Sequence, residues 1–442
     1  MEKIENHNPN SSKKKKIINA WAFYDWANSV YPLVISTAIF PIFYEAMTSV
    51  KDSDGNIIND NVQFFGATFK NSELYSYVVA ASFLVVTILS PILSGIADYA
   101  GNKKTFLKLF CYLGAVSTMT LFFFNPEHLE LSMVSIFLAS IGFWNSLVFY
   151  NAYLPEIAPP EDHDRVSAKG FSLGYLGSSI LLIGCLVGIM SFEMPAKYSF
   201  ILVGIWWIGF SQITYAFLPK GVKKEKKGHF IANGFGEIKK VWAFVRQTSR
   251  LKKYLASFFI FSMGIQTIML MAVLFAKKEI FIGKYEEDAG SGLIISVLLI
   301  QFIAILGAYV FSFSSKKIGN VKTLGIALIV WIFVCIYGYY IVTPNDYYIL
   351  AAIVGLVMGG TQSLSRSTYS KFLPETQDTT SFFSYYDISE KVGIILGMVI
   401  FGFVEGYSGD MRTSVLALLS FFVVAFLLLL RIPKNEKEGL SV

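Results

Sequence analysis

Five ionisable residues stand inside long apolar segments, where a charge needs a partner or a task. They are Asp25, Arg366, Asp387, Glu390 and Lys391. A charged side chain at the centre of a bilayer costs about 2.5 kcal/mol or more, so such residues mark ion pairs, proton relays or substrate sites. Asp387 and Lys391 are four residues apart and can pair on one helix. Asp25 and Arg366 are then left as candidate partners for each other.

Amide side chains accompany two of these charges at helical spacing. Asn28 lies three residues after Asp25, and Gln362 lies four residues before Arg366, so each pair shares one helix face. A zwitterionic solute needs an anion, a cation and amide dipoles around an apolar pocket. We therefore predict a substrate cavity lined by Tyr24, Asp25, Asn28, Gln362 and Arg366. Asn145 and Gln266 are added to this lining because a resemblance given below implies that the spans carrying them face the cavity.

The same residues also have structural interpretations, which the sequence leaves open. Asp25 suits the first turns of a helix at the membrane surface, where the helix dipole favours an acid. Arg366 can extend its side chain to the lipid headgroups. Asn145 and Gln266 suit hydrogen bonds between neighbouring helices.

We assign Glu390 and Lys391 to a gating or structural pair rather than to substrate binding. If transport is coupled to protons, Asp25 and Glu390 are the candidate carriers, because a buried unpaired carboxylate holds its proton more tightly. An Asp25 paired with Arg366 would instead stay ionised and act as a gate. The sequence does not choose between these roles.

No cofactor or metal is expected. The four histidines fall in predicted loops or the N-terminal tail, and the segment beginning at Gly101 lacks the upstream glycine of a phosphate-binding loop. Energy for any transport must then come from a gradient of protons, another ion or the solute itself. We also find no cluster of nucleophile, acid and base, so an enzyme is not expected.

The elements that carry these residues are predicted to be membrane helices. Of the 442 residues, 54% are hydrophobic and 15% are charged, whereas soluble domains have about 25% charged residues. Continuous apolar runs favour helices over a barrel. The sequence predicts twelve spans, near residues 19–46, 74–97, 106–124, 131–153, 168–190, 198–218, 254–276, 291–313, 321–342, 347–370, 385–407 and 412–431.

Two loop motifs occur twice, half a chain apart. Gly101-Asn-Lys-Lys-Thr105 recurs as Gly319-Asn-Val-Lys-Thr323, and the segment 150–156 recurs at 369–375, with Leu-Pro-Glu at the end of both. The offsets are 218 and 219 residues, which indicates a tandem duplication. Repeated helical halves are typical of transporters with the substrate site between them.

The duplication divides the chain into two six-helix bundles. We predict a cytoplasmic tail at residues 1–18, bundles at 19–218 and 254–431, a basic linker at 219–253 and a cytoplasmic tail at 432–442. The linker is expected to contain an amphipathic helix on the cytoplasmic leaflet, or else to be a solvated tether.

Basic residues give the orientation. In this topology 28 of the 37 lysines and arginines lie on the side of the two termini, and 7 lie in the opposite loops. The positive-inside rule then places both termini in the cytoplasm. The net charge of +6 therefore reflects membrane topology rather than nucleic-acid binding. Compact loops suggest a bacterial protein, in the plasma (inner) membrane.

The loop after the second predicted span carries a gate motif. Ser94-Gly-Ile-Ala-Asp98-Tyr-Ala-Gly101-Asn-Lys103-Lys104 resembles the loop signature of the major facilitator superfamily, with serine at the first glycine position. We predict that Asp98, Lys103 and Lys104 form a cytoplasmic gate contact. Lys316 replaces the acid in the second copy, so only the first copy is expected to make an acidic gate contact.

A narrower resemblance begins in the first span. Ala22-Phe-Tyr-Asp25-Trp-Ala-Asn28-Ser-Val-Tyr31 is similar to the signature of the vacuolar-effluxer-like family, whose fungal members are autophagy-related amino-acid effluxers. The resemblance implies an all-α major-facilitator fold, two six-helix bundles with pseudo-two-fold symmetry, and rocker-switch export of an amino acid or related metabolite. We expect a monomer whose partners are a small-molecule substrate and the lipid bilayer. A non-transporting sensor on the same scaffold, or a transporter of another metabolite, remains an alternative.

Overall fold

The structure is a computed structural model that describes residues 9–52, 57–221, 230–286 and 289–433. The predicted tails and linker lie partly outside these residues. In chain order the helical segments are α1 Pro9–Asn28, a π-helical segment Tyr31–Ile39, α2 Phe40–Thr48, α3 Asn71–Ala100, α4 Lys103–Thr120, α5 Leu129–Asn151, α6 Leu154–Ile157, α7 His163–Ser191, α8 Tyr198–Phe217, α9 Phe230–Gln247, α10 Ser249–Phe275, α11 Ala289–Ile318, α12 Asn320–Tyr340, α13 Pro344–Phe372, α14 Thr379–Ser408 and α15 Met411–Leu430.

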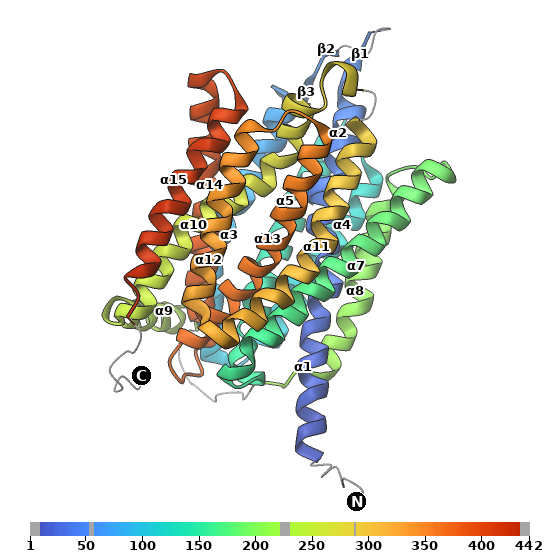
Figure 1. Ribbon diagram of the computed structural model, residues 1–442. Helices are drawn as coiled ribbons and strands as arrows, with labels where there is room; N and C mark the ends of the chain where they lie inside the picture. The colour runs from blue at the N-terminus through green and yellow to red at the C-terminus, as the bar shows by residue number, and fades with distance from the viewer. Residues whose placement is uncertain (1–8, 53–56, 222–229, 287–288, 434–442) are drawn as a thin grey trace, which may run out of the picture.

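The long helices form an upright bundle with both described ends of the chain at one side (Figure 1). In the described residues, eleven helical segments are long and apolar enough to cross a membrane. The remaining predicted span, residues 385–407, is α14, which has 30 residues and packs against α3 and α10 but is not among those eleven. Its first half carries Asp387, Glu390 and Lys391, which reduce its apolar character.

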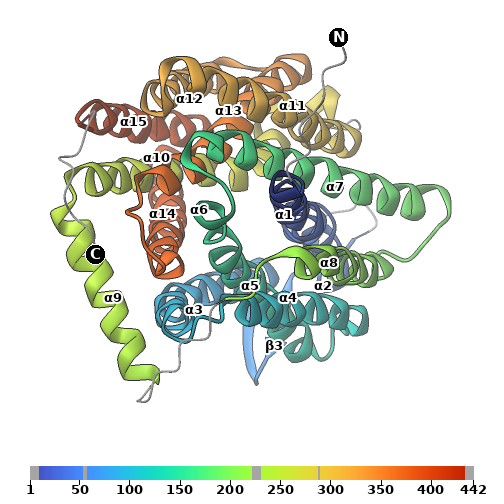
Figure 2. The same ribbon diagram turned by 90° about the horizontal axis from the view of Figure 1, so that it is seen from below.

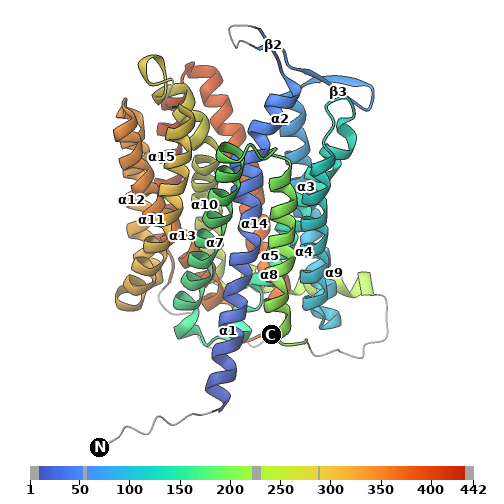
Figure 3. The same cartoon turned by 90° about the vertical axis from the view of Figure 1, so that its right-hand side faces the viewer.

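The first span is longer than predicted and changes its winding midway. It runs from Ser12 to Thr48, through α1, the π-helical segment and α2. Pro32 has no N–H to donate in a helix, and the hydroxyl of Thr37 donates to its carbonyl oxygen at 2.8 Å. The wider π turn accommodates the proline without ending the span. At the other end, α1 extends beyond the rest of the bundle (Figure 3).

Two apolar cores correspond to the two parts of the chain. One contains buried side chains between Ile18 and Leu218. The other is built mostly from residues between Val241 and Ile432. Seen from the side of the termini, α14 lies next to α3, and α7 lies next to α11 and α13 (Figure 2). Helix α7 of the first half therefore packs against the second half, and α14 of the second half packs against the first.

The repeated glycine turns occupy matching places in the two halves. Gly101 ends α3 in the left-handed conformation, with φ of 63°. Gly319 lies between α11 and α12 with φ of 87°. A side chain would strain both turns, which explains why the duplicated motif keeps glycine there. Both turns lie on the side of the bundle where the chain begins and ends.

Two short hairpins, which the sequence analysis did not foresee, join α2 to α3. Strand β1, Val50–Lys51, pairs with β2, Ile57–Asn59, and β3, Asn61–Phe64, pairs with β4, Ala67–Lys70. They lie at the opposite end from the chain termini (Figure 3).

Helix α9, in the linker, lies across the bundle rather than along it (Figures 1 and 2). Val241 and Val245 are buried, while the Trp242 side chain stays half exposed and its ring stacks on Tyr385 of α14 at 5.6 Å. The Tyr385 hydroxyl donates to the carbonyl of Ile238 at 3.0 Å. Because α9 also packs on α3, it touches both halves on the side of the termini.

Candidate functional site

A buried ion pair joins the first span to the second half of the chain. Nη2 and Nη1 of Arg366 in α13 lie 3.0 and 3.1 Å from Oδ2 of Asp25 in α1. The hydroxyl of Tyr150 in α5 donates to the same oxygen at 2.9 Å. Arg366 is 2% exposed and Asp25 is 5% exposed. Both side chains are therefore enclosed by protein, and Asp25 lies well beyond the first turn of α1.

Arg366 uses all five of its N–H donors on the protein. Besides the two bonds to Asp25, Nε donates to the hydroxyl of Ser167 at 2.9 Å and Nη2 donates to the Ser167 carbonyl at 2.9 Å. Nη1 also donates to Oδ1 of Asn151 at 3.3 Å. A guanidinium has five donors and no acceptor. The Ser167 hydroxyl in turn donates to the carbonyl of Ser363 at 2.8 Å.

Aromatic rings and a glycine enclose the pair. The guanidinium carbon of Arg366 lies 4.1 Å from the ring centre of Phe171 and 4.8 Å from that of Trp21, which suits cation–π attraction. On α7, a Cβ added to Gly170 would meet Oδ2 of Asp25 and would lie 2.8 Å from Nη2 of Arg366. Glycine at this position lets α7 approach the ion pair closely.

A second contact between the halves involves Asp98, at the last turn of α3. Its carboxylate accepts hydrogen bonds from the backbone N–H groups of Ser381 at 2.6 Å and Thr380 at 3.3 Å, in the first turn of α14. An acid facing a helix N-terminus is favoured by the helix dipole and the free N–H groups. Nearby, Lys103 pairs with Glu156 and donates to the Thr379 hydroxyl at 3.2 Å.

A third contact occupies the matching position in the other half. Asp164, in the first turn of α7, pairs with Lys371 at the end of α13, with Nζ to Oδ2 at 2.6 Å. It also accepts from Asn320 at 2.7 Å and from the Ser315 hydroxyl at 2.7 Å. Asp98 and Asp164 both belong to the first half, and the second half contributes Lys371 and Asn320 to this contact. In this contact the acid is supplied by α7, because the end of α11 carries Lys316 where α3 carries Asp98.

We call these three contacts together the terminus-side contact, because the end of α3 and the starts of α7 and α14 lie on the side of the chain termini (Figure 1). They join α1 and α7 to α13, α3 to α14, and α7 to α11 and α12.

A separate charged group lies farther along α14. Nζ of Lys391 is 3.1 Å from Oδ1 of Asp387 and 2.9 Å from Oε2 of Glu390. The other Glu390 oxygen accepts from Nε2 of Gln266 in α10 at 2.7 Å. Lys391 is fully buried, and its Nζ lies 3.5 Å from the ring centre of Trp144 in α5. We call Asp387, Glu390 and Lys391 the α14 triad.

The structure does not bring the seven predicted cavity residues into one lining. Tyr24 packs inside the first half, 5.0 Å from Tyr150 between ring centres. Asn145 is fully buried and donates to the Ile141 carbonyl of its own helix at 3.0 Å. Asn28 is 1% exposed. Helical spacing predicts which residues share a face, but not which neighbouring helix that face meets.

The other predicted residues fall into different groups. Gln362 accepts a hydrogen bond from the Tyr175 hydroxyl of α7 at 2.7 Å, so it does join the two halves beside Arg366. Gln266 of α10 instead donates to Glu390 of the α14 triad. Lys104 lies away from α14, because its Nζ donates to the Leu218 carbonyl within the first half at 2.8 Å.

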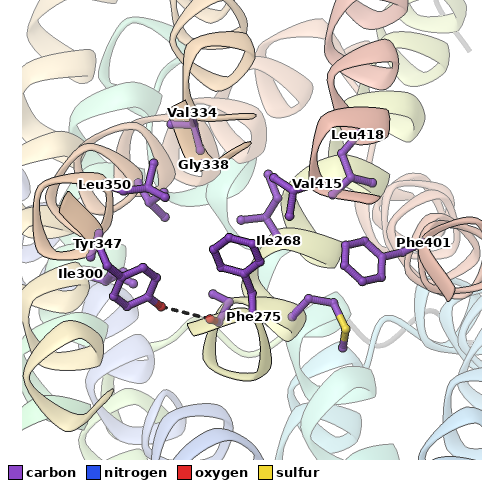
Figure 4. Close-up of a pocket in the computed structure, with 14 residues that line it drawn as sticks. Ile268, Phe275, Ile300, Val334, Gly338, Tyr347, Leu350, Phe401, Val415 and Leu418 are labelled. Carbon is purple, nitrogen blue, oxygen red and sulfur yellow. Dashed lines mark hydrogen bonds between the residues drawn. The ribbon is translucent and has the colours of Figure 1, made fainter. Parts of the chain in front are cut away.

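An apolar pocket lies wholly inside the second half, between α10, α11, α12, α13, α14 and α15. Ile268, Phe275, Leu350, Phe401 and Leu418 are among its lining residues (Figure 4). The Tyr347 hydroxyl at its edge donates to the Ala272 carbonyl at 3.0 Å. None of the predicted site residues lines this pocket, and it has no charged side chain.

Sequence reasoning missed several residues of the terminus-side contact. Tyr150 lies at the start of the repeated motif at 150–156, so its position was visible but its role was not. Asp164 and Lys371 were placed in loops, because the predicted spans stopped short of both. Ser167 offered no signal, since serine is common in membrane helices.

Comparison with known proteins gives a consistent result over the whole chain. A family model described as "Vacuole effluxer Atg22 like" matches residues 13–438. YxiO, an uncharacterised MFS-type transporter of Bacillus subtilis (strain 168), is 29% identical and aligns over 96% of both chains. Autophagy-related protein 22 of Coccidioides immitis (strain RS) is 22% identical over 96% of this chain and 88% of its own.

Solved structures show a similar fold at low identity. The major facilitator transporter FucP in its outward conformation has a TM-score of 0.69 and 12% identity, covering 96% of this chain and 99% of its own. The proton:xylose symporter XylE has a TM-score of 0.68 and 14% identity, covering 96% and 97%. At these identities the similarity establishes the fold alone.

Proposed function

The chain belongs to the Atg22-like vacuole effluxer family and has the major facilitator fold, and from this premise we propose that it exports a small amino acid or related metabolite. The family makes it a secondary transporter, not an enzyme. Its two halves rock against each other around a shared central cavity. The protein works as a monomer in the plasma membrane of a bacterium, with both termini in the cytoplasm.

The observation that carries this proposal is the ion pair of Asp25 and Arg366. One partner belongs to each half, and both are buried. When the halves separate on this side, a carboxylate and a guanidinium become free at the same depth. A zwitterionic amino acid carries the complementary ammonium and carboxylate groups, so it can satisfy both charges that the opening leaves unpaired.

Two further observations support the rocking motion. The contacts of Asp98 and Asp164 join charged side chains of the first half to polar groups of the second half, so they can break when the halves part. The guanidinium of Arg366 has no donor left for a solute in this arrangement. The described structure is therefore the state closed on the side of the termini, and solute binding at Arg366 belongs to another state.

The direction of transport rests on the family and on charge. The matching family model is that of vacuole effluxers, and the excess of basic residues on the side of the termini favours a cytoplasmic position for that side. Export then starts from a state in which the terminus-side contact is open to the cytoplasm.

Reconstitution into liposomes tests the proposal. Purified protein would be assayed for exchange of each labelled amino acid against the same unlabelled compound inside the vesicles. We expect exchange of at least one small amino acid, with a loss of tenfold or more (about 1.4 kcal/mol) in Asp25→Asn and in Arg366→Lys. Lysine retains the charge but cannot replace the five donors in a fixed fork.

Asp346→Asn is the matched control, because this acid caps α13 and accepts from Thr343. It should retain exchange. Exchange of no amino acid, or wild-type rates in both site variants, would refute the proposal. Binding of an amino acid without exchange would instead favour a sensor on a transporter scaffold.

A further inference from the structure

The α14 triad carries one negative charge too many for its surroundings. Asp387 and Glu390 are both within 3.1 Å of the single ammonium group of Lys391. Among the described residues, the charged groups that act on Asp387 are Lys391 and Glu390. Arg366, which with Glu390 acts on Tyr386 of α14, is already paired with Asp25. In a membrane interior an uncompensated carboxylate calls for a cation.

Within the described part of the chain, the other elements around the triad supply no such cation. Trp144 of α5 covers Lys391, Gln266 of α10 binds Glu390, and Ser90 of α3 faces Asp387. On α14 itself, Tyr386 lies near Glu390. Lys391 is fully buried and fills the centre of the group, which leaves little room for a metal ion with its several oxygen ligands. A proton needs only one free oxygen.

One carboxylate oxygen is free for that proton. Oδ2 of Asp387 is buried and makes no hydrogen bond within the part of the chain that the structure describes. The Ser90 hydroxyl opposite it lies close enough to act on this carboxylate but makes no hydrogen bond of ordinary length there, and these residues are 5% and 1% exposed. Buried polar atoms are nearly always satisfied, so each unpartnered atom indicates a missing proton, water or ion.

Unpartnered hydroxyl groups continue from this point towards the termini. Ser90, Ser94 and Asp98 are spaced by four residues and share one face of α3. On α14, Thr380 and Ser381 start the helix against Asp98. The hydroxyl groups of Ser94, Thr380 and Ser381 are buried and, like that of Ser90, lack a partner in the described structure. This strip between α3 and α14 has the polarity to hold ordered water.

We infer that Asp387 is the proton-carrying group of this transporter, and that the polar strip between α3 and α14 leads its proton to the side of the termini. Oδ2 of Asp387 takes the proton from a hydronium ion, so an O–H bond forms and a water molecule is released. The reverse step returns the proton to water on the other side. With Asp387 neutral, Lys391 and Glu390 balance each other. This inference rests on the proposed transport function.

The first test needs no substrate. Infrared titration of the purified full-length protein, from about pH 9 to about pH 5, reports the carbonyl stretch of a protonated carboxyl group. We expect one such band to appear as the pH falls, to shift in Asp387→Glu, to disappear in Asp387→Asn and to persist in Asp25→Asn. Persistence of every band in Asp387→Asn, or loss only in Asp25→Asn, would overturn the assignment.

The second test concerns the path. In deuterated water the same band shifts as its proton exchanges, and the rate of this shift measures access to Asp387. Ser94→Val should slow exchange several-fold. The control is Thr87→Val on the same helix, whose hydroxyl already binds the Phe83 carbonyl at 2.8 Å, and it should leave the rate unchanged. Equal rates in both variants would refute the path.

A sodium titration completes the comparison. If sodium rather than protons balances the triad, sodium chloride should raise the melting temperature of the wild type more than potassium chloride does, and no carboxyl band should appear. That result would overturn the inference while leaving amino-acid export intact. Absence of amino-acid exchange with a normal carboxyl band would do the reverse.

Discussion

Gly170 and Arg366 come from different halves of the chain, yet a Cβ at residue 170 would lie 2.8 Å from Nη2 of that arginine. The same Cβ would meet Oδ2 of Asp25. Gly174 and Gly177 also face α1, at Ser29 and Trp26. The glycines on this face of α7 therefore allow the helix to approach the first span and the ion pair closely.

Gly170→Ala should weaken closure on the side of the termini. Overpacking costs about 1–3 kcal/mol, and it falls on the closed state because the contacting atoms separate when the halves part. We expect a lower melting temperature and faster modification of a cysteine placed at Ser363. Gly184→Ala on the same helix is the control, since its Cβ would meet nothing within 4 Å. Equal effects of the two variants would contradict the argument.

The pair of Asp25 and Arg366 should show strong coupling. Breaking a buried pair from one side costs about 3–5 kcal/mol, because it leaves the other charge uncompensated. Asp25→Asn and Arg366→Gln should each destabilise the detergent-solubilised protein, and the double variant should lose less than the sum. Thermal unfolding of the four proteins in one detergent measures this coupling. Additive losses would show that the two side chains are not partners.

Asp164→Asn should open the terminus-side contact more than removal of a nearby surface acid. The variant loses the ion pair with Lys371, in which the side chain of Asp164 is only 7% exposed. The control is Asp162→Asn, which removes an ion pair with Arg165 in which the side chains are 35% and 69% exposed. Such a surface pair contributes about 0–1 kcal/mol.

The readout for Asp164 is maleimide labelling of a cysteine at Ser363, which is 1% exposed. The native Cys111, Cys185 and Cys335 are buried and give a low background. We expect faster labelling in Asp164→Asn and no change in Asp162→Asn. The reverse order would show that α7 is not held through Asp164.

The start of α15 should depend on pH through Asp410. This side chain caps the helix by accepting from the Thr413 N–H at 2.6 Å, and that bond lowers the pKa of Asp410 below its ordinary value of 3.8. Since the carboxylate form is the bound one, its stabilisation is present above pH 3.8 and is lost as the pH falls through the lower folded-state pKa.

Asp410→Ala should remove the same cap at neutral pH, at a cost of about 1 kcal/mol. Hydrogen exchange at the first turn of α15 should therefore be faster in the variant than in the wild type near pH 6, after correction for intrinsic rates. A difference between the two proteins that grows with acidity would contradict the assignment of the cap to the carboxylate.

The sequence predicted the positions of the helices along the chain better than the contacts between them. The apolar runs located every long helix within several residues, and the charge on α14 did not hide it because the duplication required a helix there. The partnership of Asp25 with Arg366 followed from elimination, since these were the charges without a local partner. Asp164 was missed because its acid lies on the helix opposite the repeated motif. One sequence copy cannot show which half supplies each partner.

The substrate-cavity prediction illustrates the same limit. Asn145 and Tyr24 have the right depth and the right chemistry, but both face their own half. The depth of a residue follows from its position along the span. The neighbour that its side chain faces depends on how several helices pack together. Gln362 lies on the same helix face as Arg366, as the spacing predicted, and it accepts a hydrogen bond from Tyr175 of the other half.

All N–H donors of Arg366 are used within the protein while the terminus-side contact is closed, so the hydrogen-bonding capacity of this residue depends on the conformation. While the terminus-side contact is made, a solute arriving from either direction meets an arginine with no hydrogen to offer. Under the proposed transport function, Arg366 can bind a solute only after the two halves part. An unoccupied opening would then leave a buried guanidinium without a partner, which disfavours leakage.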